Sequence, residues 1–293
     1  MKLCIFGNKT TTKELLSVLI QSQIKVDHLV TLSIDKAEVA KISGQDSALI
    51  EFAASHGVFV FNPDSYSLKS DKDITFFQNH HFDLGLCTGW QRIIPQPIID
   101  SFTHGIYGWH GSGFEFPNGR GRSPLNWTLR LGMTKVYHNL FRYAYGADDG
   151  MVYETEVIKI DQNDYISDLQ LKALQHIKQS SIRLVKDISR GTLQLMEQPN
   201  HPYIQLPSLD IESGKIYPQN MGCLQSLNII RSCSKPFPGA FVEYEEKNYR
   251  IWRASSVIPD INNNKECIVL NGKLFVKLRD GYIVSDDFEI TSR

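Results

Sequence analysis

One histidine lies in the most glycine-rich part of the sequence, and its side chain could transfer protons. His110 falls within residues 105–124, which hold six of the twenty glycines of the chain. An imidazole takes up and releases a proton near neutral pH, so His110 is a candidate acid–base group. Asp148 and Asp149 follow next to Gly150, and an aspartate at such a turn could orient the imidazole. The alternatives are a local loop hydrogen bond for the histidine and an Asx turn for the aspartates.

Two arginines in the same stretch could bind phosphate. Arg120 and Arg122 flank Gly121, and guanidinium groups bind phosphate oxygens in pairs. Because glycine lets the backbone approach a ligand closely, we interpret residues 105–124 as a loop beyond the carboxyl ends of parallel strands, where α/β sheets bind ligands. A solvated surface turn is the alternative. Neither an activated serine or cysteine nor a metal-ligand spacing of histidines is evident, so we expect no metal.

The elements that must position these residues alternate between strand and helix patterns. Apolar runs predict strands over residues 2–6, 26–32, 58–61 and 82–87. Helical spacing follows residues 10–12 and recurs over 45–56 and 70–79. This alternation predicts a Rossmann-like, doubly wound, mostly parallel sheet. The first strand lacks a GxGxxG motif after it, which disfavours a conventional NAD-dependent dehydrogenase.

From residue 168 onward the chain has a different residue pattern. Residues 168–190 predict a long amphipathic helix that stops at Gly191. Four prolines then interrupt a stretch of weak periodicity. From residue 236 onward, short alternating runs are separated by the turn residues 262–264, 271–272 and 280–281. We therefore predict a catalytic domain over residues 1–204, with a linker from about 191, and an OB-like antiparallel β domain over 205–293.

Charge and cysteine content disfavour several classes of function. The 293 residues include 31 Lys and Arg against 32 Asp and Glu, a formal net charge of −1, so bulk attraction to nucleic acid is disfavoured. Apolar runs are shorter than the roughly 18 residues of a membrane-spanning helix, and the N-terminal run is too short for a secretory signal. Five scattered cysteines without a CxxC pair indicate reduced thiols in a cytoplasmic protein.

Several separated motifs resemble the folate-dependent formyltransferases. The motifs of the central region are His110-Gly111-Ser112, Pro117, Arg120-Gly121-Arg122-Ser123-Pro124, Trp127 and Asp148-Asp149-Gly150. Those outside it are Gly89-Trp90, Ile94-Pro95, Ile229-Ile230-Arg231 and Pro236-Phe237-Pro238-Gly239-Ala240. They stand in the order of the family and cover most of the chain, so the sequence is identified as a member of this family.

The resemblance implies that the amine of an acceptor attacks the formyl group of N10-formyltetrahydrofolate directly. It gives His110 the role of stabilising the oxyanion or transferring a proton, and Asp148 the role of holding His110 in its useful protonation state. The residues that it places near the folate are Gly89, Trp90, Ile94, Tyr145, Gly146 and Asp148. The residues that we expect to bind the acceptor are Trp109, Ser112, Arg120, Gly121, Arg122 and Ser123.

One departure from the family pattern affects the expected oxyanion site. The family has an asparagine two residues before its histidine, where this chain has Gly108. Losing one such donor costs about 2.7–4 kcal/mol of transition-state stabilisation. A backbone N–H near Gly111, an ordered water or another side chain would have to replace it, and Asn118 and Asn126 are candidates by residue type alone. A catalytically impaired homologue that binds folate or nucleotide is therefore one alternative function.

Charge separates the two catalytic alternatives. Residues 231–293 carry ten Lys and Arg against nine Asp and Glu, whereas a tRNA-binding domain needs a basic surface. We therefore expect the acceptor to be a nucleotide-linked amino-dideoxy sugar for surface polysaccharide biosynthesis, with methionyl-tRNA formyl transfer as the alternative. The nucleotide (UDP or dTDP), the sugar and the position of its amine stay open. The resemblance also implies a homodimer, and the short apolar runs predict no membrane contact.

Overall fold

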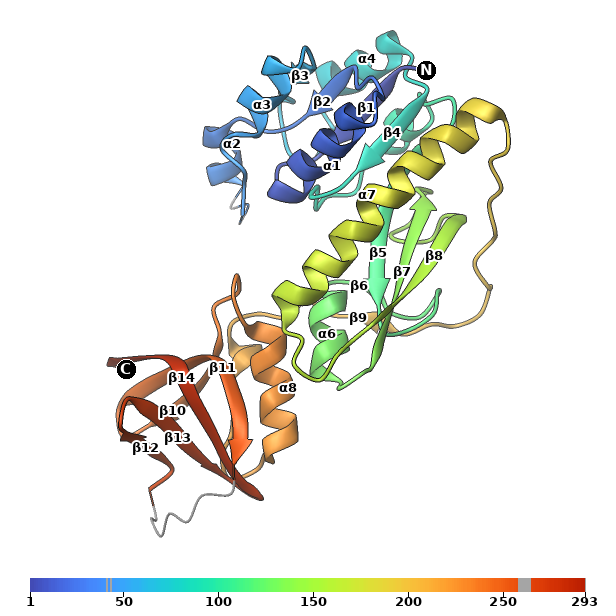
Figure 1. Ribbon diagram of the computed structural model, residues 1–293. Coiled ribbons are helices and arrows are strands. Elements are labelled where there is room, and N and C mark those ends of the chain that lie inside the picture. The colour runs from blue at the N-terminus through green and yellow to red at the C-terminus, as the bar shows by residue number, and fades with distance from the viewer. Residues whose placement is uncertain (41, 43, 258–264, 293) are drawn as a thin grey trace. The chain divides into compact units, whose positions relative to one another are not determined.

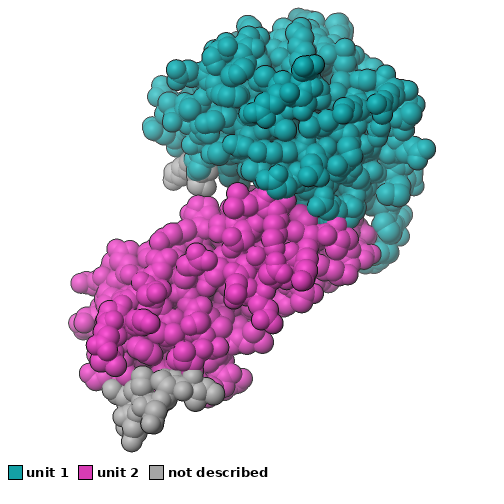
Figure 2. All heavy atoms as spheres, viewed as in Figure 1, with its two compact units in different colours: residues 1–110, 138–156, 173–202 teal, residues 111–137, 157–172, 203–293 magenta. Residues whose placement is uncertain are grey.

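The computed structural model describes residues 1–40, 42, 44–257 and 265–292 (Figure 1). The chain divides into two compact units, which Figure 2 distinguishes by colour. Unit 1 comprises Met1–His110, His138–Glu156 and Ala173–Pro202, and unit 2 comprises Gly111–Tyr137, Val157–Lys172 and Tyr203–Arg293. Each unit therefore collects several segments of the chain. The division into sequence domains at residue 204 stays a prediction.

A seven-stranded sheet forms the centre of unit 1, with the order β3-β2-β1-β4-β5-β7-β8. Its strands are β1 (Leu3–Phe6), β2 (His28–Val30), β3 (Phe59–Phe61), β4 (Leu84–Cys87), β5 (Ile106–Ser112), β7 (Lys135–Arg142) and β8 (Val152–Lys159). Pairing is parallel from β3 through β2, β1 and β4 to β5. The predicted Rossmann-like, mostly parallel sheet is confirmed.

Side chains that alternate along the strands form two buried apolar clusters, one on each face of the sheet. Leu3 and Ile5 pack with α1 (Thr10–Gln21), α3 (Leu49–Ser55) and α7 (Ile166–Arg190). Cys4 and Phe6, which point the other way, pack with α2 (Ile34–Val39), α4 (Asp71–His80) and α5 (Gln96–Ile99). Helices on both faces of a parallel sheet define a doubly wound α/β fold.

Local signals mark the ends of two predicted helices. The hydroxyl of Ser70 accepts a hydrogen bond from the backbone N–H of Asp73 and caps α4. Gly191 follows α7 with a φ of +70°, which glycine adopts readily. Helix α2 is an addition that the sequence reading did not include.

The glycine-rich stretch is largely not the loop that we expected. Residues Ile106–Ser112 form β5, a strand inside the central sheet, and β6 (Arg120–Gly121) and α6 (Pro124–Arg130) follow it. The interpretation as one long loop is therefore wrong, although residues 113–119 and 122–123 lie outside strands and helices. Within β5, Gly108 allows close packing, because a Cβ on it would lie 2.2 Å from the hydroxyl oxygen of Tyr143.

The C-terminal part of unit 2 is a five-stranded antiparallel sheet with the order β10-β11-β14-β13-β12. Its strands are β10 (Ala240–Tyr244), β11 (Lys247–Val257), β12 (Cys267–Leu270), β13 (Lys273–Leu278) and β14 (Gly281–Ser292). The helix α8 (Cys223–Cys233) packs on this sheet through Ile229 and Ile230. Unit 2 also holds β9 (Gln205–Leu206), which pairs with β6, and a short 3₁₀ helix, η1 (Glu212–Gly214). The small antiparallel domain is confirmed, whereas the turn predicted at residues 262–264 lies outside the described residues.

Three further properties bear on function. None of the helices in the described ranges is long and apolar enough to cross a membrane. Within the same ranges, no group of three or more His, Cys, Asp or Glu side chains is placed to hold a metal ion. All five cysteines are free thiols.

Candidate active site

A histidine–aspartate pair lies in unit 1. Nδ1 of His110 is 3.4 Å from Oδ2 of Asp148, and the two side chains are 6% and 23% exposed. The contact joins β5 to the loop between β7 and β8, 38 residues further along the chain. The fold therefore brings together the two residues for which we predicted catalytic roles.

The register of the sheet places His110 at the carboxyl edge of the parallel strands. The last residue of β4, Cys87, pairs with Gly108 on β5, so His110 extends past the carboxyl end of β4, where α/β sheets bind ligands. Asn139 on β7 donates a hydrogen bond of 3.3 Å to the backbone carbonyl of His110. The hydroxyl of Thr155 donates to the amide oxygen of Asn139 at 2.6 Å, and these bonds fix the main chain at the histidine.

The loop that carries Asp148 is held by its own backbone contacts. Asp148 has a φ of +57°, and the amide of Gln198 donates to the carbonyls of Asp148 and Gly150 at 2.9 and 2.8 Å. The carboxylate of Asp149 accepts a hydrogen bond from the N–H of Gly146 at 2.9 Å, so Asp149 closes the turn. Gly150 leaves no room for a side chain, because a Cβ there would lie 1.6 Å from the carbonyl oxygen of Arg142.

Three of the predicted folate-binding residues lie after β4. Gly89 has a φ of +76°, and a Cβ on it would lie 2.9 Å from the hydroxyl of Thr12. Trp90 is 7% exposed, and its indole N–H has no acceptor among the described residues. Its ring packs edge-on against Tyr66 at 4.7 Å. Ile94 is buried in the apolar core, so this residue anchors the loop to the core.

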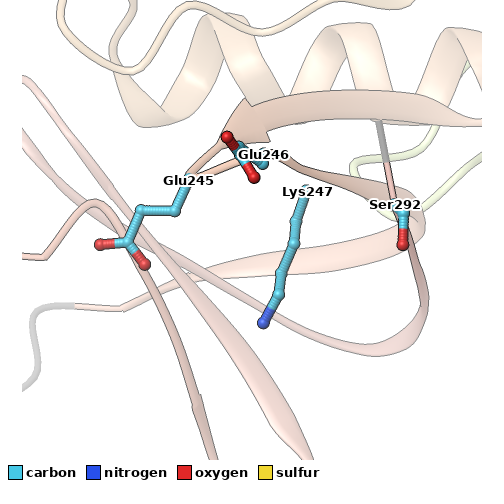
Figure 3. Close-up of a pocket in the computed structure, with 4 residues that line it drawn as sticks. All are labelled: Glu245, Glu246, Lys247 and Ser292. Atoms are coloured by element: carbon cyan, nitrogen blue, oxygen red, sulfur yellow. The ribbon is translucent and has the colours of Figure 1, made fainter.

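The other two lie in the loop of Asp148. Tyr145 is 86% exposed, and Gly146 is held by Asp149. A cavity of about 300 Å³ borders this loop, lined also by Glu197 and Gln198. A second hollow of about 520 Å³ lies at the β10–β11 turn, where the side chains of its four lining residues diverge (Figure 3). Because these side chains point apart, we do not consider this hollow a candidate binding site.

The predicted acceptor-binding residues have unequal environments. Arg120 is 8% exposed and lies 4.6 Å from the centre of the Tyr203 ring, whereas Arg122 is exposed. The hydroxyl of Ser112 is engaged with the backbone of Phe114, from which it accepts a bond of 3.1 Å and to which it donates one of 3.0 Å. Arg122 is therefore the arginine that presents its guanidinium on the surface.

The remaining predicted residues of this set have close local contacts or strained backbone, and their role in binding the acceptor stays a prediction. Gly121 has a φ of +111°, and a Cβ on it would lie 2.3 Å from the carbonyl of Leu206. Ser123 precedes α6 with a φ of +51°. The indole of Trp109 donates to the hydroxyl of Ser180 on α7 at 2.9 Å, which ties this side chain to the helix.

The two asparagines considered for the place of Gly108 both have contacts inside unit 2. The side-chain oxygen of Asn118 accepts from the N–H of Ile204 at 3.0 Å, and the amide of Asn126 donates to the carbonyl of Ser232 at 2.8 Å. The space over Gly108 is instead filled by Tyr143, whose hydroxyl oxygen would lie 2.2 Å from a Cβ on this glycine. Tyr143 was not among the predicted site residues. The only feature of the sequence that could have pointed to it is Gly108, which leaves room for a neighbouring side chain.

A second histidine cluster lies between the sheet and α7. Nδ1 of His138 is 2.6 Å from Nδ1 of His176, whose Nε2 is 2.6 Å from a carboxylate oxygen of Glu154. Burial, together with the charges of His176 and His110, lowers the pKa of His138 well below its usual value. Burial works to raise the pKa of Glu154, but hydrogen bonds from His176 and Arg183 outweigh it and bring this pKa to about 2. This network joins β7, β8 and α7 and serves the packing of unit 1.

The fold and the site define an α/β enzyme with a histidine–aspartate pair at the carboxyl edge of a parallel sheet. Residues 1–185, more than half of the chain, match the family described as formyl transferase. The protein belongs to the formyl transferase family and is a formyltransferase.

Individual relatives carry two kinds of name. A methionyl-tRNA formyltransferase of Mycoplasma pneumoniae is 26% identical over 255 residues, which cover 87% of this chain and 79% of that protein. WlaRD, a sugar 3N-formyl transferase solved in the presence of dTDP and 5-N-formyl-THF, has a TM-score of 0.69 at 16% identity, covering 98% of this chain and 97% of that chain. The N-formyltransferase from Helicobacter canadensis, in complex with folinic acid and dTDP-3-aminofucose, has a TM-score of 0.68 at 15% identity, covering 99% and 100%. At these identities the two structures establish the shared fold.

Proposed function

We propose that this enzyme transfers the formyl group of N10-formyltetrahydrofolate to the amine of a nucleotide-linked amino-dideoxy sugar. The donor is supported by the two solved neighbours, which were determined with 5-N-formyl-THF and with folinic acid. The same two structures were determined with dTDP and with dTDP-3-aminofucose, which supports this class of acceptor.

The chemistry requires no nucleophile from the protein. The acceptor amine adds to the formyl carbon, a C–N bond forms, and an electron pair moves onto the formyl oxygen. The resulting tetrahedral adduct collapses, the bond from carbon to N10 breaks, and N10 leaves with that electron pair. One proton passes from the amine to N10, and in this proposal His110 carries it. The carboxylate of Asp148, 3.4 Å from Nδ1, stabilises the positive charge on His110 during the transfer.

The folate is a substrate that the loop after β4 and the loop of Asp148 can hold. The buried indole N–H of Trp90 needs an acceptor, and a pterin carbonyl or ring nitrogen supplies one. Tyr145, 86% exposed, has a ring free to lie over a planar ligand. The exposed guanidinium of Arg122 is suited to the diphosphate of the acceptor.

The observation that carries the choice of acceptor is the internal compensation of positive charge in unit 2. Lys215 pairs with Glu243 at 2.6 Å, and Lys235 pairs with Asp287 at 2.8 Å. Lys172 pairs with Asp164 at 2.6 Å. Cations that are already paired add little to binding a tRNA backbone, which depends on neutralising many phosphates.

The test is mass spectrometry of reaction mixtures that contain the folate donor and a panel of UDP- and dTDP-linked 3-amino and 4-amino dideoxyhexoses. We expect one sugar to gain the mass of a formyl group, and the His110→Ala variant to form no product. The exposed His56 provides a matched control, because His56→Ala removes the same side chain away from the site. Product from His110→Ala at the wild-type rate would refute the role of the histidine. Light scattering on the same preparation tests the homodimer.

The second candidate acceptor is initiator methionyl-tRNA, because the relative from Mycoplasma pneumoniae carries that name. Filter binding of tRNA at rising salt separates the two candidates. Several phosphate contacts would give tight binding with a steep dependence on salt. We expect weak binding at physiological salt, and tight binding would favour the tRNA.

A further inference from the structure

A phenol occupies the place of the side chain that Gly108 lacks. Atoms of Tyr143, which follows β7, would lie 2.2 Å (Oη) and 2.5 Å (Cε1 and Cζ) from a Cβ on Gly108. The backbone N–H of Tyr143 donates to the carbonyl of Ile106 on β5 at 2.7 Å. The register of these strands therefore holds the ring of Tyr143 against the glycine, and any larger residue at position 108 would displace it.

The phenol lies on the same face of β5 as the catalytic histidine. Side chains two residues apart on a strand share a face, so the space over Gly108 and the side chain of His110 open in the same direction. Two residues of extended chain span about 6.6 Å. That separation leaves room for a small reacting group between the phenol and the imidazole. The neighbouring Trp109 points the other way, toward Ser180 on α7.

The surroundings of Tyr143 keep its hydroxyl protonated and place it beside the thiol of Cys87. Burial, with the nearby Cys87 and Asp148, raises the pKa of Tyr143 well above its usual value. Burial likewise raises the pKa of the Cys87 thiol to about 12, and Cys87 is hydrogen-bonded to Tyr143 and to the backbone of Trp90. A thiol and a phenol can each donate to the other, so the hydroxyl of Tyr143 can turn its proton from the Cys87 sulfur to a ligand.

We propose that the hydroxyl of Tyr143 is a catalytic hydrogen-bond donor to the formyl oxygen as this oxygen becomes negative. This assignment rests on the proposed formyl transfer. A neutral, preorganised O–H in a half-buried site stabilises a developing oxyanion, and loss of one such donor lowers kcat by about 10²–10³-fold. Gly108 is then the residue that admits the phenol to the site.

The first test is Tyr143→Phe, which keeps the ring and removes the hydroxyl. We expect kcat to fall by about 10²-fold while the KM values for donor and acceptor stay within about threefold. Tyr107→Phe is the matched control, because Tyr107 precedes Gly108, is fully buried on the other face, and its hydroxyl has no partner among the described residues. This control keeps wild-type kcat.

The second test moves the hydrogen-bond donor from position 143 to position 108 on β5. Gly108→Asn in the Tyr143→Ala background places an amide where the phenol was, and we expect kcat at least tenfold above that of Tyr143→Ala alone. A third readout is the carbonyl stretch of ¹³C-formyl donor bound without acceptor. This stretch lies at lower frequency in the wild type than in Tyr143→Phe if the hydroxyl reaches the formyl oxygen.

The outcomes separate the two proposals. Wild-type kcat in Tyr143→Phe, or an unchanged carbonyl stretch, overturns the role of Tyr143 and leaves the formyl transfer in place. If the wild-type enzyme transfers formyl to neither a nucleotide sugar nor methionyl-tRNA, the proposed function fails before any variant is compared, and the role of Tyr143 fails with it.

Discussion

Substitutions of Asp148 separate the charge of this residue from its backbone conformation. Asp148 combines a carboxylate 3.4 Å from His110 with a φ of +57°. Asp148→Asn removes the charge and keeps a residue type that tolerates positive φ. Asp148→Gly removes the charge and relieves the backbone, and Asp148→Ala removes the charge and leaves the strain.

The expected loss of activity follows from the distance. Opposite unit charges 3.4 Å apart interact by about 1 kcal/mol at a dielectric constant of 80 and by about 5 kcal/mol at 20. The Asp148 carboxylate is 23% exposed, so the value lies between these limits, and a fall in kcat of about 10²-fold is expected for Asp148→Asn. Asp149→Asn, which removes the neighbouring charge, changes kcat by less than about threefold.

The expected change in stability follows from the backbone. An L-residue other than Asn or Asp in the left-handed region costs about 1–2 kcal/mol relative to glycine. Asp148→Gly should therefore melt about 2–4 °C above Asp148→Ala, although both variants lose activity. The assays are formyl transfer under saturating substrates and thermal unfolding. Full activity of Asp148→Asn would refute the electrostatic role, and equal melting of the Gly and Ala variants would refute the backbone argument.

Three further predictions follow from single contacts. Arg122→Ala should raise the KM of the nucleotide-linked acceptor about tenfold without changing the melting temperature. Arg120→Ala should lower the melting temperature, because Arg120 is buried against Tyr203. Steady-state kinetics measure the KM and calorimetry measures the melting temperature. Gly150→Ala should destabilise the fold by about 1–3 kcal/mol in urea unfolding, because a Cβ would lie 1.6 Å from the carbonyl of Arg142; an unchanged midpoint would contradict this. Burial and the nearby charge of His80 lower the pKa of His28 from 6.5 to about 4, so the unfolded chain binds more protons between these values. The urea midpoint should fall as the pH is lowered from 6.5 to 4, and less steeply in His28→Gln.

The architecture could be predicted where local sequence decides it. Short apolar runs became strands, as at β4, and the hydroxyl of Ser70 marked the start of α4. Helix α8 was not predicted, because its buried face includes the polar residues Ser226, Asn228 and Ser232, which weaken the apolar period. The hydroxyl of Ser232 donates to the carbonyl of Ile229 within the helix at 2.7 Å, which lets this polar residue be buried.

Within the site, the roles of the candidate residues stay predictions, whereas the structure shows which of them come together. The resemblance pointed to His110 and Asp148, and the fold brings them together. The burial of Arg120 depends on Tyr203, which comes from another part of the chain. The contact of Tyr143 with Gly108 depends on the register of β7 against β5, and no pattern within either segment reveals it. Gly108 shows what such a position can do, because its missing side chain leaves room for the ring of Tyr143.

The measurement that tests the central claim most directly is a competition between the two acceptors. The enzyme is given ¹³C-formyl donor with initiator methionyl-tRNA and an amino-sugar nucleotide from the panel in one mixture, at physiological salt. The ratio of formylated products equals the ratio of the kcat/KM values, weighted by the acceptor concentrations. We predict that the label enters the sugar at least 10²-fold faster than the tRNA. Label found mainly on methionyl-tRNA would contradict the assignment of the acceptor, and no label on either would contradict the proposed transfer itself.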